Sequence, residues 1–556
     1  MSRHRSPAAP SPSVLSSSGL MAAGTLVSRL TGFVRASMLA AAIGISLHAE
    51  VFNVANTIPN SLYILVAGGV FNTVLVPQLV RAIKNDADGG DAYANRVLTL
   101  GALALAGITA VLVVLAPVLL RLMVDQSFFS NPDLAPQRES LIDFSRWCLP
   151  QIFFYGVFVL VGQILNARGR FGPMMWAPIA NNLISVAIIG LYLVLYAGQA
   201  DPSGYTTTQE VLLGLGSTLG IAVQTMILWP YLKAAGFAVR PRFDFRGTGL
   251  GHTLRLGAWT VGFVIVNQLA FYVMVHRATA GTAQVVEGAR DASGFTVYSN
   301  AFLLTQVPHS IVTVSLATAT MPLVSRLAAD GLLRDVADEM VRTVRLVLAV
   351  IVPFAAALLV LGPALATVLF SWGRASGDTG TLGLTLVAFA PGMVMFSLHY
   401  VVLRGFYAVE DTRTPFFIQC VIASVNIVVA ITATMAVRPE LVAPVLALAY
   451  GASYLVGALV SLNVLARRLG GLSRRDLLGY AQRVVAAALG AGSLAWGCLL
   501  VSAQLGLDVS QKADALALLA VGGLVGAAAY LGLARLLHVS EVGQVVSLVT
   551  SRSRLG

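Results

Sequence analysis

The sequence contains little charge, few cysteines and no long hydrophilic stretch. Charged residues make up only 11% of the 556 residues, whereas they are about a quarter of an ordinary soluble domain. The three cysteines, Cys148, Cys420 and Cys498, have no paired spacing, so neither a disulfide framework nor a zinc site is indicated. The sequence also lacks a glycine-rich phosphate loop and a nucleophile with a neighbouring base. We therefore expect no enzyme activity, no metal and no cofactor.

Apolar residues, by contrast, are abundant. They form 57% of the chain, and the mean hydropathy is +0.80. Because a membrane-spanning helix needs about 20 apolar residues, the apolar runs predict an all-α polytopic membrane protein with about 14 transmembrane helices. The expected spans are 17–43, 50–80, 97–124, 141–166, 175–197, 210–233, 252–278, 294–325, 343–371, 380–403, 415–437, 440–465, 482–506 and 513–537.

The connections between these spans are short. The longest are 125–140, 198–209, 234–251 and 279–293. An active site would have to be assembled from loop fragments, so an integral-membrane enzyme is the least favoured function. Transport is the more natural function for such a chain.

The net charge of +11 is distributed as in a membrane protein. With a cytoplasmic N-terminus and fourteen crossings, about 25 of the 36 lysines and arginines fall in or beside cytoplasmic segments and about 6 in external loops. This bias predicts that both termini are cytoplasmic. The most basic loop, 466–483, suits anionic lipid headgroups. No aromatic and basic platform accompanies the charge, so we expect no nucleic-acid partner.

The stretch 28–77 carries polar groups that are costly to place in a membrane. Arg29 and Arg35 lie in the first predicted span, and Glu50 opens the second. A charge at the bilayer centre costs about 3 kcal/mol, so such residues usually face a bundle interior or a water-filled cavity. Helical spacing places further polar residues on one side of the second span: Glu50, Asn53, Thr57 and Asn60, with Asn56 beside them.

Several landmarks recur at a nearly constant offset. Pro77 and Pro322 are each followed by an arginine four residues later, at an offset of 245, and Pro173 and Pro415 are offset by 242. The arginines of the first span, shifted by the same amount, fall beside Arg277 in the seventh. This pattern predicts that spans 1 to 6 are duplicated as spans 7 to 12, in two parallel repeats related by an axis along the membrane normal.

Proline interrupts several of the predicted spans. It removes a hydrogen bond of the helix and bends it, which membrane helices tolerate where neighbours or cavity water satisfy the backbone. Bent helices between repeats suit alternating access, although proline is also generally commoner in membrane helices. The prolines are Pro59, Pro117, Pro150, Pro178, Pro308, Pro353, Pro363 and Pro391.

Several segments carry a resemblance to a known family. In chain order they include SRLTGFVR, EVFNVANTIPN, GGVFNTVLVPQLV, MPLVSRLA, LFSWG and RGFYAVEDTRTP. Together they resemble the MurJ/MviN family of the MOP superfamily, the lipid II flippases of peptidoglycan synthesis. The resemblance covers roughly residues 15 to 540.

The resemblance implies two six-helix lobes around a central cavity and two C-terminal helices that form a groove for the lipid tail. It implies transport of undecaprenyl-diphosphate-linked disaccharide-pentapeptide to the outer leaflet of the bacterial inner membrane, driven by membrane potential or an ion gradient. Compatible further partners are membrane lipids, a coupling ion and proteins of cell-wall synthesis. The implied domains are a tail at 1–16, an N-lobe at 17–235, a C-lobe at 250–468, a helix pair at 478–538 and a second tail at 539–556.

The resemblance also implies roles for individual residues. Arg29 and Arg35 match the arginines of the family's first-helix motif and would bind the diphosphate, since arginine suits phosphate oxygens. Glu50 stands where the family commonly has an aspartate and would act in gating or charge compensation. The alternatives are a snorkelling or helix-pairing role for Arg35 and an interfacial cap for Glu50. Asn53 and Asn60 would line the path.

Two positions depart from the family pattern. Tyr63 and Leu303 stand where family members carry further cavity arginines. Arg277 is the candidate replacement, ahead of Arg255 and Arg146, and its alternative is snorkelling at the external end of the seventh span. Six polar residues could line the second lobe or form interhelical hydrogen bonds instead: Asn267, Gln268, His276, Asn300, Gln306 and His309.

Two other functions stay open at this stage. An exporter of drugs or of another lipid-linked sugar would be favoured by a mainly acidic or aromatic cavity. A membrane scaffold that recruits cell-wall enzymes without transport is compatible with the missing arginines, and it predicts that substitutions of the buried charges are harmless.

Overall fold

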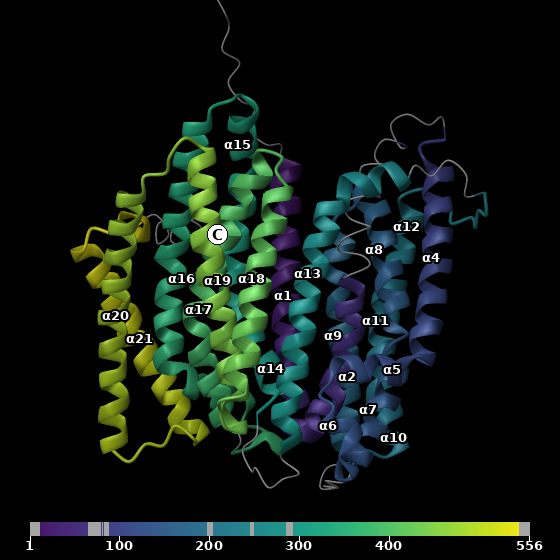
Figure 1. Ribbon diagram of the computed structural model, residues 1–556, viewed down its shortest axis with the longest axis horizontal. Helices are drawn as coiled ribbons and strands as arrows, with labels where there is room; N and C mark the ends of the chain where they lie inside the picture. Colours follow the sequence, from purple (N-terminus) through teal and green to yellow (C-terminus); the bar gives the residue numbers. More distant parts are fainter. Residues whose placement is uncertain are drawn as a thin grey trace, which may run out of the picture.

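The chain is a multi-pass helical membrane protein (Figure 1). The computed structural model describes residues 12–64, 79, 82, 88–196, 204–244, 250–284, 293–377 and 379–543, and in these residues it contains helices and no strand. Thirteen of the described helical segments are long and apolar enough to span a membrane. They correspond one to one with thirteen predicted spans. The other, 50–80, continues past Ile64 outside the described residues, so the count of fourteen stays a prediction.

We call the helices before residue 245 the N-bundle. Most of them lie on the right in Figure 1, while α1 appears between α18 and α13 in that view. Within the N-bundle α1 packs on α9, α2 on α7 and α8, and α4 on α8. Its helices are α1 (Pro12–Ile43), α2 (Leu47–Tyr63), α4 (Asp91–Val114), α5 (Ala116–Met123), α6 (Ser127–Ser130), η2 (Pro132–Leu134), α7 (Ala135–Cys148), α8 (Gln151–Ala167), α9 (Gly172–Tyr196), α10 (Thr207–Glu210), η3 (Val211–Leu215), α11 (Gly216–Met226) and α12 (Leu228–Ala234).

The following helices form the C-bundle, in which α17 packs against α16 and α19, and α13 against α18. They are α13 (Leu250–Ala283), α14 (Phe295–Pro308), η5 (His309–Thr313), α15 (Val314–Ala329), α16 (Leu333–Phe370), η6 (Gly373–Ala375), α17 (Gly380–Ala408), α18 (Arg413–Thr434), η7 (Pro439–Leu441) and α19 (Val442–Arg468). The last two helices, α20 (Arg474–Gln504) and α21 (Lys512–Leu536), pack on each other and on α16, at the yellow edge of Figure 1.

Large apolar side chains point outward along many of these helices. Leu122, Val194 and Leu524 are 75%, 81% and 73% exposed. Such exposure would be unfavourable in water but is expected where lipid chains surround a helix whose backbone hydrogen bonds are satisfied internally. The polar residues discussed below line internal chambers or join the two bundles instead.

Only some of the prolines in the predicted spans interrupt a helix. Pro117 and Pro150 stand at breaks, since α4 ends at Val114 before α5, and α7 ends at Cys148 before α8. Pro308 precedes a π-helical turn, and π-turns commonly relieve a local break in helical hydrogen bonding. The remaining prolines, by contrast, lie inside helices that continue past them: Pro59, Pro178, Pro353, Pro363 and Pro391.

Glycine allows close packing at the centre of the C-bundle. A Cβ atom added to Gly392 of α17 would lie 2.9 Å from the Cα atom of Gly451 in α19, so the two backbones touch there. Small residues at such contacts let membrane helices approach and gain van der Waals attraction.

Replacing Gly392 by alanine should therefore separate α17 and α19. We expect a loss of about 1–3 kcal/mol, the usual range for overpacking, seen as a lower midpoint of thermal unfolding in detergent. Gly107→Ala is the matched control, because a Cβ at Gly107 meets nothing within 4 Å. Equal midpoints for the two variants would contradict the proposed close contact.

Candidate functional site

A chamber of about 390 Å³ lies between α1, α2, α9 and α14, and we call it the N-chamber. Arg29 and Arg35 of α1 line it, together with Asn53 of α2 and Asn300 of α14. The arginines are six residues apart in one helix, and Arg29 is exposed while Arg35 is half-buried. The structure thus places both arginines of this helix beside an internal chamber.

Neither of these arginines forms an ion pair with an acidic side chain among the described residues. Other arginines at the bundle ends do have such partners. Arg168 pairs with Asp91, and Arg468 pairs with Asp411. A charge carried by a membrane-spanning helix is costly unless a partner or water satisfies it, so the N-chamber is suited to an anionic ligand that supplies the missing counter-charge.

A second chamber, the C-chamber, has a volume of about 700 Å³ and is enclosed mainly by the C-bundle. Asn60 of α2 lines it from the N-bundle side. Its wall includes amide side chains from α13 and α18, namely Asn267, Gln268 and Gln419. Gln419 Nε2 donates to Asn267 Oδ1 at 3.3 Å, and Gln268 Nε2 donates to the carbonyl oxygen of Ser61.

The two chambers adjoin, since Thr57 and Ser299 line both. The predicted polar side of α2 faces this interior: Asn53 and Thr57 reach the N-chamber, and Thr57 and Asn60 reach the C-chamber. Asn56 also lines the N-chamber and accepts a hydrogen bond from Gln151 at 3.0 Å. A polar path therefore runs along α2 between the bundles.

Glu50 closes one end of this path and lines neither chamber. Its carboxylate is 1% exposed. Oε1 accepts from the backbone N–H of Phe295 at 2.6 Å and from Thr282 Oγ1 at 3.0 Å, and Oε2 accepts from the N–H of Thr296 at 2.7 Å. Glu50 thus caps the first turn of α14, where unpaired N–H groups and the helix dipole favour a negative charge.

These bonds tie α2 of the N-bundle to α13 and α14 of the C-bundle. Asn53 Nδ2 adds a bond to Thr296 Oγ1 at 3.2 Å. Gly294 stands directly at this junction, where an added Cβ would lie 1.6 Å from Thr282 Oγ1. We call this end of the molecule, the lower end in Figure 1, the closed end.

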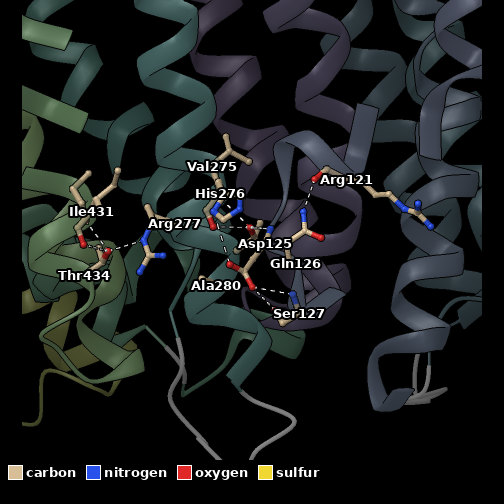
Figure 2. Close-up of polar contacts among 12 residues, drawn as sticks. Arg121, Asp125, Gln126, Ser127, Val275, His276, Arg277, Ala280, Ile431 and Thr434 are labelled. Carbon is tan, nitrogen blue, oxygen red and sulfur yellow. Dashed lines mark hydrogen bonds and ion pairs between the residues drawn. The ribbon is translucent and has the colours of Figure 1, made fainter. Parts of the chain in front are cut away.

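A second contact between the bundles lies at the same end (Figure 2). Asp125, which follows α5, places Oδ2 3.8 Å from His276 Nδ1 of α13. The backbone N–H of Asp125 donates to Thr279 Oγ1 at 3.0 Å. Asp125 Oδ1 accepts from the hydroxyl of Ser127 at 2.6 Å. His276, one of the expected cavity residues, thus takes part in joining the bundles.

Arg277 does not take the position that the sequence led us to expect. Figure 2 shows its guanidinium pointing toward α18, where Nε donates to Thr434 Oγ1 at 2.9 Å. It lines neither chamber, so it is not brought together with Arg29. Arg277 lies on the side of α13 that packs against α18.

We expect Arg277→Ala to retain transport, with at most a small loss of stability from one hydrogen bond, about 1 kcal/mol. Growth of a strain that depends on this protein would measure transport. Failure to grow with normal amounts of protein in the membrane would show that Arg277 meets the cargo in another conformation.

The structure shows the surroundings of Tyr63 and Leu303, where the resemblance led us to expect arginine. Tyr63 stacks on Tyr155 with ring centroids 5.0 Å apart, and Leu303 lines the N-chamber. The sequence reasoning missed a different cation, Arg404 near the end of α17, which lines the C-chamber. Its signal was the RGFYA segment itself, which begins with this arginine.

Comparison with known proteins gives a consistent result. The family model described as "Lipid II flippase MurJ" matches residues 39–510. A "Probable lipid II flippase MurJ" from Vibrio cholerae is 28% identical over 537 residues, covering 95% of this chain and 96% of the relative. A protein of the same description from Rhizobium meliloti is 28% identical over 414 residues, or 73% of each chain.

Solved structures show a similar fold. "Lipid II flippase MurJ, inward closed conformation" superimposes with a TM-score of 0.72 at 16% identity, covering 93% of this chain and 98% of that one. An inward-facing multidrug resistance transporter of the MATE family, in the MOP superfamily, gives a TM-score of 0.63 at 15% identity, covering 79% of this chain and 94% of that one.

Proposed function

Since this chain belongs to the MurJ family of lipid II flippases, we propose that it moves lipid II across the bacterial inner membrane by alternating access. The cargo is undecaprenyl-diphosphate-linked disaccharide-pentapeptide, which passes from the inner to the outer leaflet. The protein acts as a transporter and catalyses no covalent step.

The observation that carries this proposal is the pair of arginines without acidic partners in the N-chamber. Arg29 and Arg35 offer planar guanidinium groups that suit diphosphate oxygens, which accept two parallel hydrogen bonds from each group. A diphosphate would supply the counter-charge that the described side chains do not provide. Asn53, in the same chamber, adds an amide donor.

The closed end sets which contacts must break during outward transport. We place this end on the outside, in line with the positive-inside distribution of charge, so that both termini lie in the cytoplasm. Glu50, Asn53, Asp125 and His276 hold the bundles together there. Outward release requires these contacts to break while the bundles rock, and the cytoplasmic ends close.

The lipid tail never needs to enter the chambers. A long isoprenoid chain is stable in hydrocarbon, and only the headgroup has to be shielded from it. We propose that the tail lies beside α20 and α21, which pack on the outside of α16. The energy comes from membrane potential or an ion gradient.

The aromatic character of the C-chamber supports one alternative. Its lining includes ten phenylalanine and tyrosine side chains, as a binding site for drugs or for another lipid-linked sugar would. A drug exporter of that kind would protect cells from cationic dyes, and it would not depend on the N-chamber arginines.

Complementation tests the proposed function. In a bacterium depleted of its own lipid II flippase, this protein should restore growth and normal cell shape. A protein that is present in the membrane in normal amounts, yet restores neither while conferring dye resistance, would support the exporter instead. If the protein neither restores growth nor confers dye resistance, the result would favour a scaffold that does not transport.

A further inference from the structure

The C-chamber has a chemistry of its own. Aromatic rings from α14, α17 and α19 form a continuous wall, in which Phe302 and Tyr450 lie 5.6 Å apart, Phe396 and Tyr454 4.9 Å, and Tyr450 and Tyr454 4.6 Å between ring centroids. Ring faces of this kind suit the apolar faces of sugar rings. The volume of about 700 Å³ lies within the range of pockets for small organic ligands, about 300–1,000 Å³.

Arg404 is the one arginine among the described residues that line this chamber, and no lysine, aspartate or glutamate accompanies it there. Its guanidinium carbon lies 4.6 Å from the centroid of the Tyr400 ring, and Nη2 donates to the Tyr400 hydroxyl. No acidic side chain of the described residues pairs with it. The contact with the ring and the bond to its hydroxyl hold the guanidinium in place while leaving other donors free for an oxyanion.

The chamber also carries hydrogen-bonding groups at defined positions. Asn426 Nδ2 lies 3.4 Å from Ser453 Oγ, and Gln419 bonds to Asn267 on the opposite helix. These amides and the hydroxyl are suited to sugar hydroxyls and peptide groups. Aromatic faces, amides and a single cation together fit a glycan that carries a carboxylate, rather than a purely apolar drug.

We propose that the C-chamber is the subsite for the glycopeptide part of the headgroup, with Arg404 pairing with a carboxylate of the peptide and the aromatic wall stacking on a sugar ring. The inference rests on the proposed function, because the diphosphate is assigned to Arg29 and Arg35 in the adjoining N-chamber. The two chambers meet at Thr57 and Ser299, so one headgroup can occupy both.

Binding measurements with three lipids test the assignment. The purified protein in detergent would be titrated with lipid II, with the same lipid lacking its peptide, and with undecaprenyl diphosphate. Arg404→Gln should weaken binding of lipid II about 10–100-fold, the value of a charge-assisted hydrogen bond, and leave the other two lipids unchanged. Arg404→Lys should recover part of the loss by restoring the charge.

Two further variants complete the design. Tyr454→Leu should weaken both lipids that contain sugar but not undecaprenyl diphosphate. Arg413→Gln is the matched control, because Arg413 also lies over aromatic rings, with its guanidinium carbon 5.5 Å from the centroid of Trp259, but lines neither chamber. It should bind all three lipids normally.

The outcomes distinguish failure of the glycopeptide subsite from failure of the proposed flippase function. If Arg404→Gln weakens all three lipids equally, Arg404 binds the diphosphate and the proposal is overturned. If it weakens none while Arg35→Ala weakens all, the proposal also fails but the flippase assignment stands. If the wild-type protein binds none of the lipids, the proposed function itself fails.

Discussion

Replacing Arg29 or Arg35 with alanine is expected to abolish complementation of a flippase-depleted strain, while the protein still folds and inserts into the membrane. Each arginine lines the N-chamber and lacks an acidic partner among the described residues, so its loss removes charge-assisted bonds to the diphosphate. At about 1.5–3 kcal/mol for each bond to a charged group, losing one bidentate pair cuts binding by two to four orders of magnitude, roughly.

The measurement is growth after depletion, together with the amount of protein in the membrane fraction. Arg146→Ala is the matched control, because Arg146 is on the surface of α7, with 51% of its side chain exposed, and pairs with Asp143 of the same helix. Full growth of the Arg29 or Arg35 variant would contradict the roles assigned to these arginines. It would favour the scaffold, for which buried charges are dispensable.

The second large effect is expected for Glu50→Ala, which should open the closed end. The substitution leaves the backbone N–H groups of Phe295 and Thr296 without their acceptor. At about 1–3 kcal/mol for each unsatisfied buried donor, the closed arrangement loses several kcal/mol. Each 1.4 kcal/mol changes the ratio of open to closed molecules about tenfold. Even a population of open molecules as small as about 1% would therefore become a large fraction.

Spin labels across the closed end can measure this shift. Asp133 of the N-bundle and Arg438 of the C-bundle are both exposed there, and cysteines would replace them in a chain whose three native cysteines have been removed. Glu50→Ala should increase the population with the longer distance. Glu210→Ala is the control, because Glu210 is also a buried carboxylate but belongs to α10 within the N-bundle. An unchanged distance distribution in the Glu50 variant would rule out its gating role.

The helical spacing in the sequence predicted the polar side of α2 correctly. Asn53, Thr57 and Asn60 face the interior because i, i+3 and i+4 steps define one side of a helix whatever surrounds it. The partners of Glu50 could not be predicted in this way. They lie 232 to 246 residues further along the chain, and which long-range contacts form depends on how the bundles pack.

The predicted duplication offers a reason for that contact. Glu50 bonds to Phe295, which is 245 residues later, the same offset that relates Pro77 to Pro322 in the sequence. In two parallel repeats, equivalent positions that lie at the axis relating the repeats would meet there. The counterpart of Glu50 at this offset is a phenylalanine, so the junction is asymmetric in charge. Pro77 itself lies outside the described residues.

Arg404 could not be predicted as a cavity residue for a local reason. Hydropathy predicts that the tenth span ends at residue 403, whereas α17 continues to Ala408 and carries Arg404 along the chamber wall. A helix boundary predicted from hydropathy alone is uncertain by a few residues. Arg277 lies near the external end of its predicted span, 252–278. The sequence could not reveal that its side chain points toward α18 rather than toward α1.

The most direct test of the central claim is the accessibility of lipid II to an external probe in cells whose only flippase is this protein. The account predicts that lipid II is cleaved or labelled from outside in cells with the wild-type protein and with Arg146→Ala. It predicts that lipid II stays protected with Arg29→Ala or Arg35→Ala at equal protein levels. Equal exposure of lipid II in all four strains, or protection in the wild type, would contradict it.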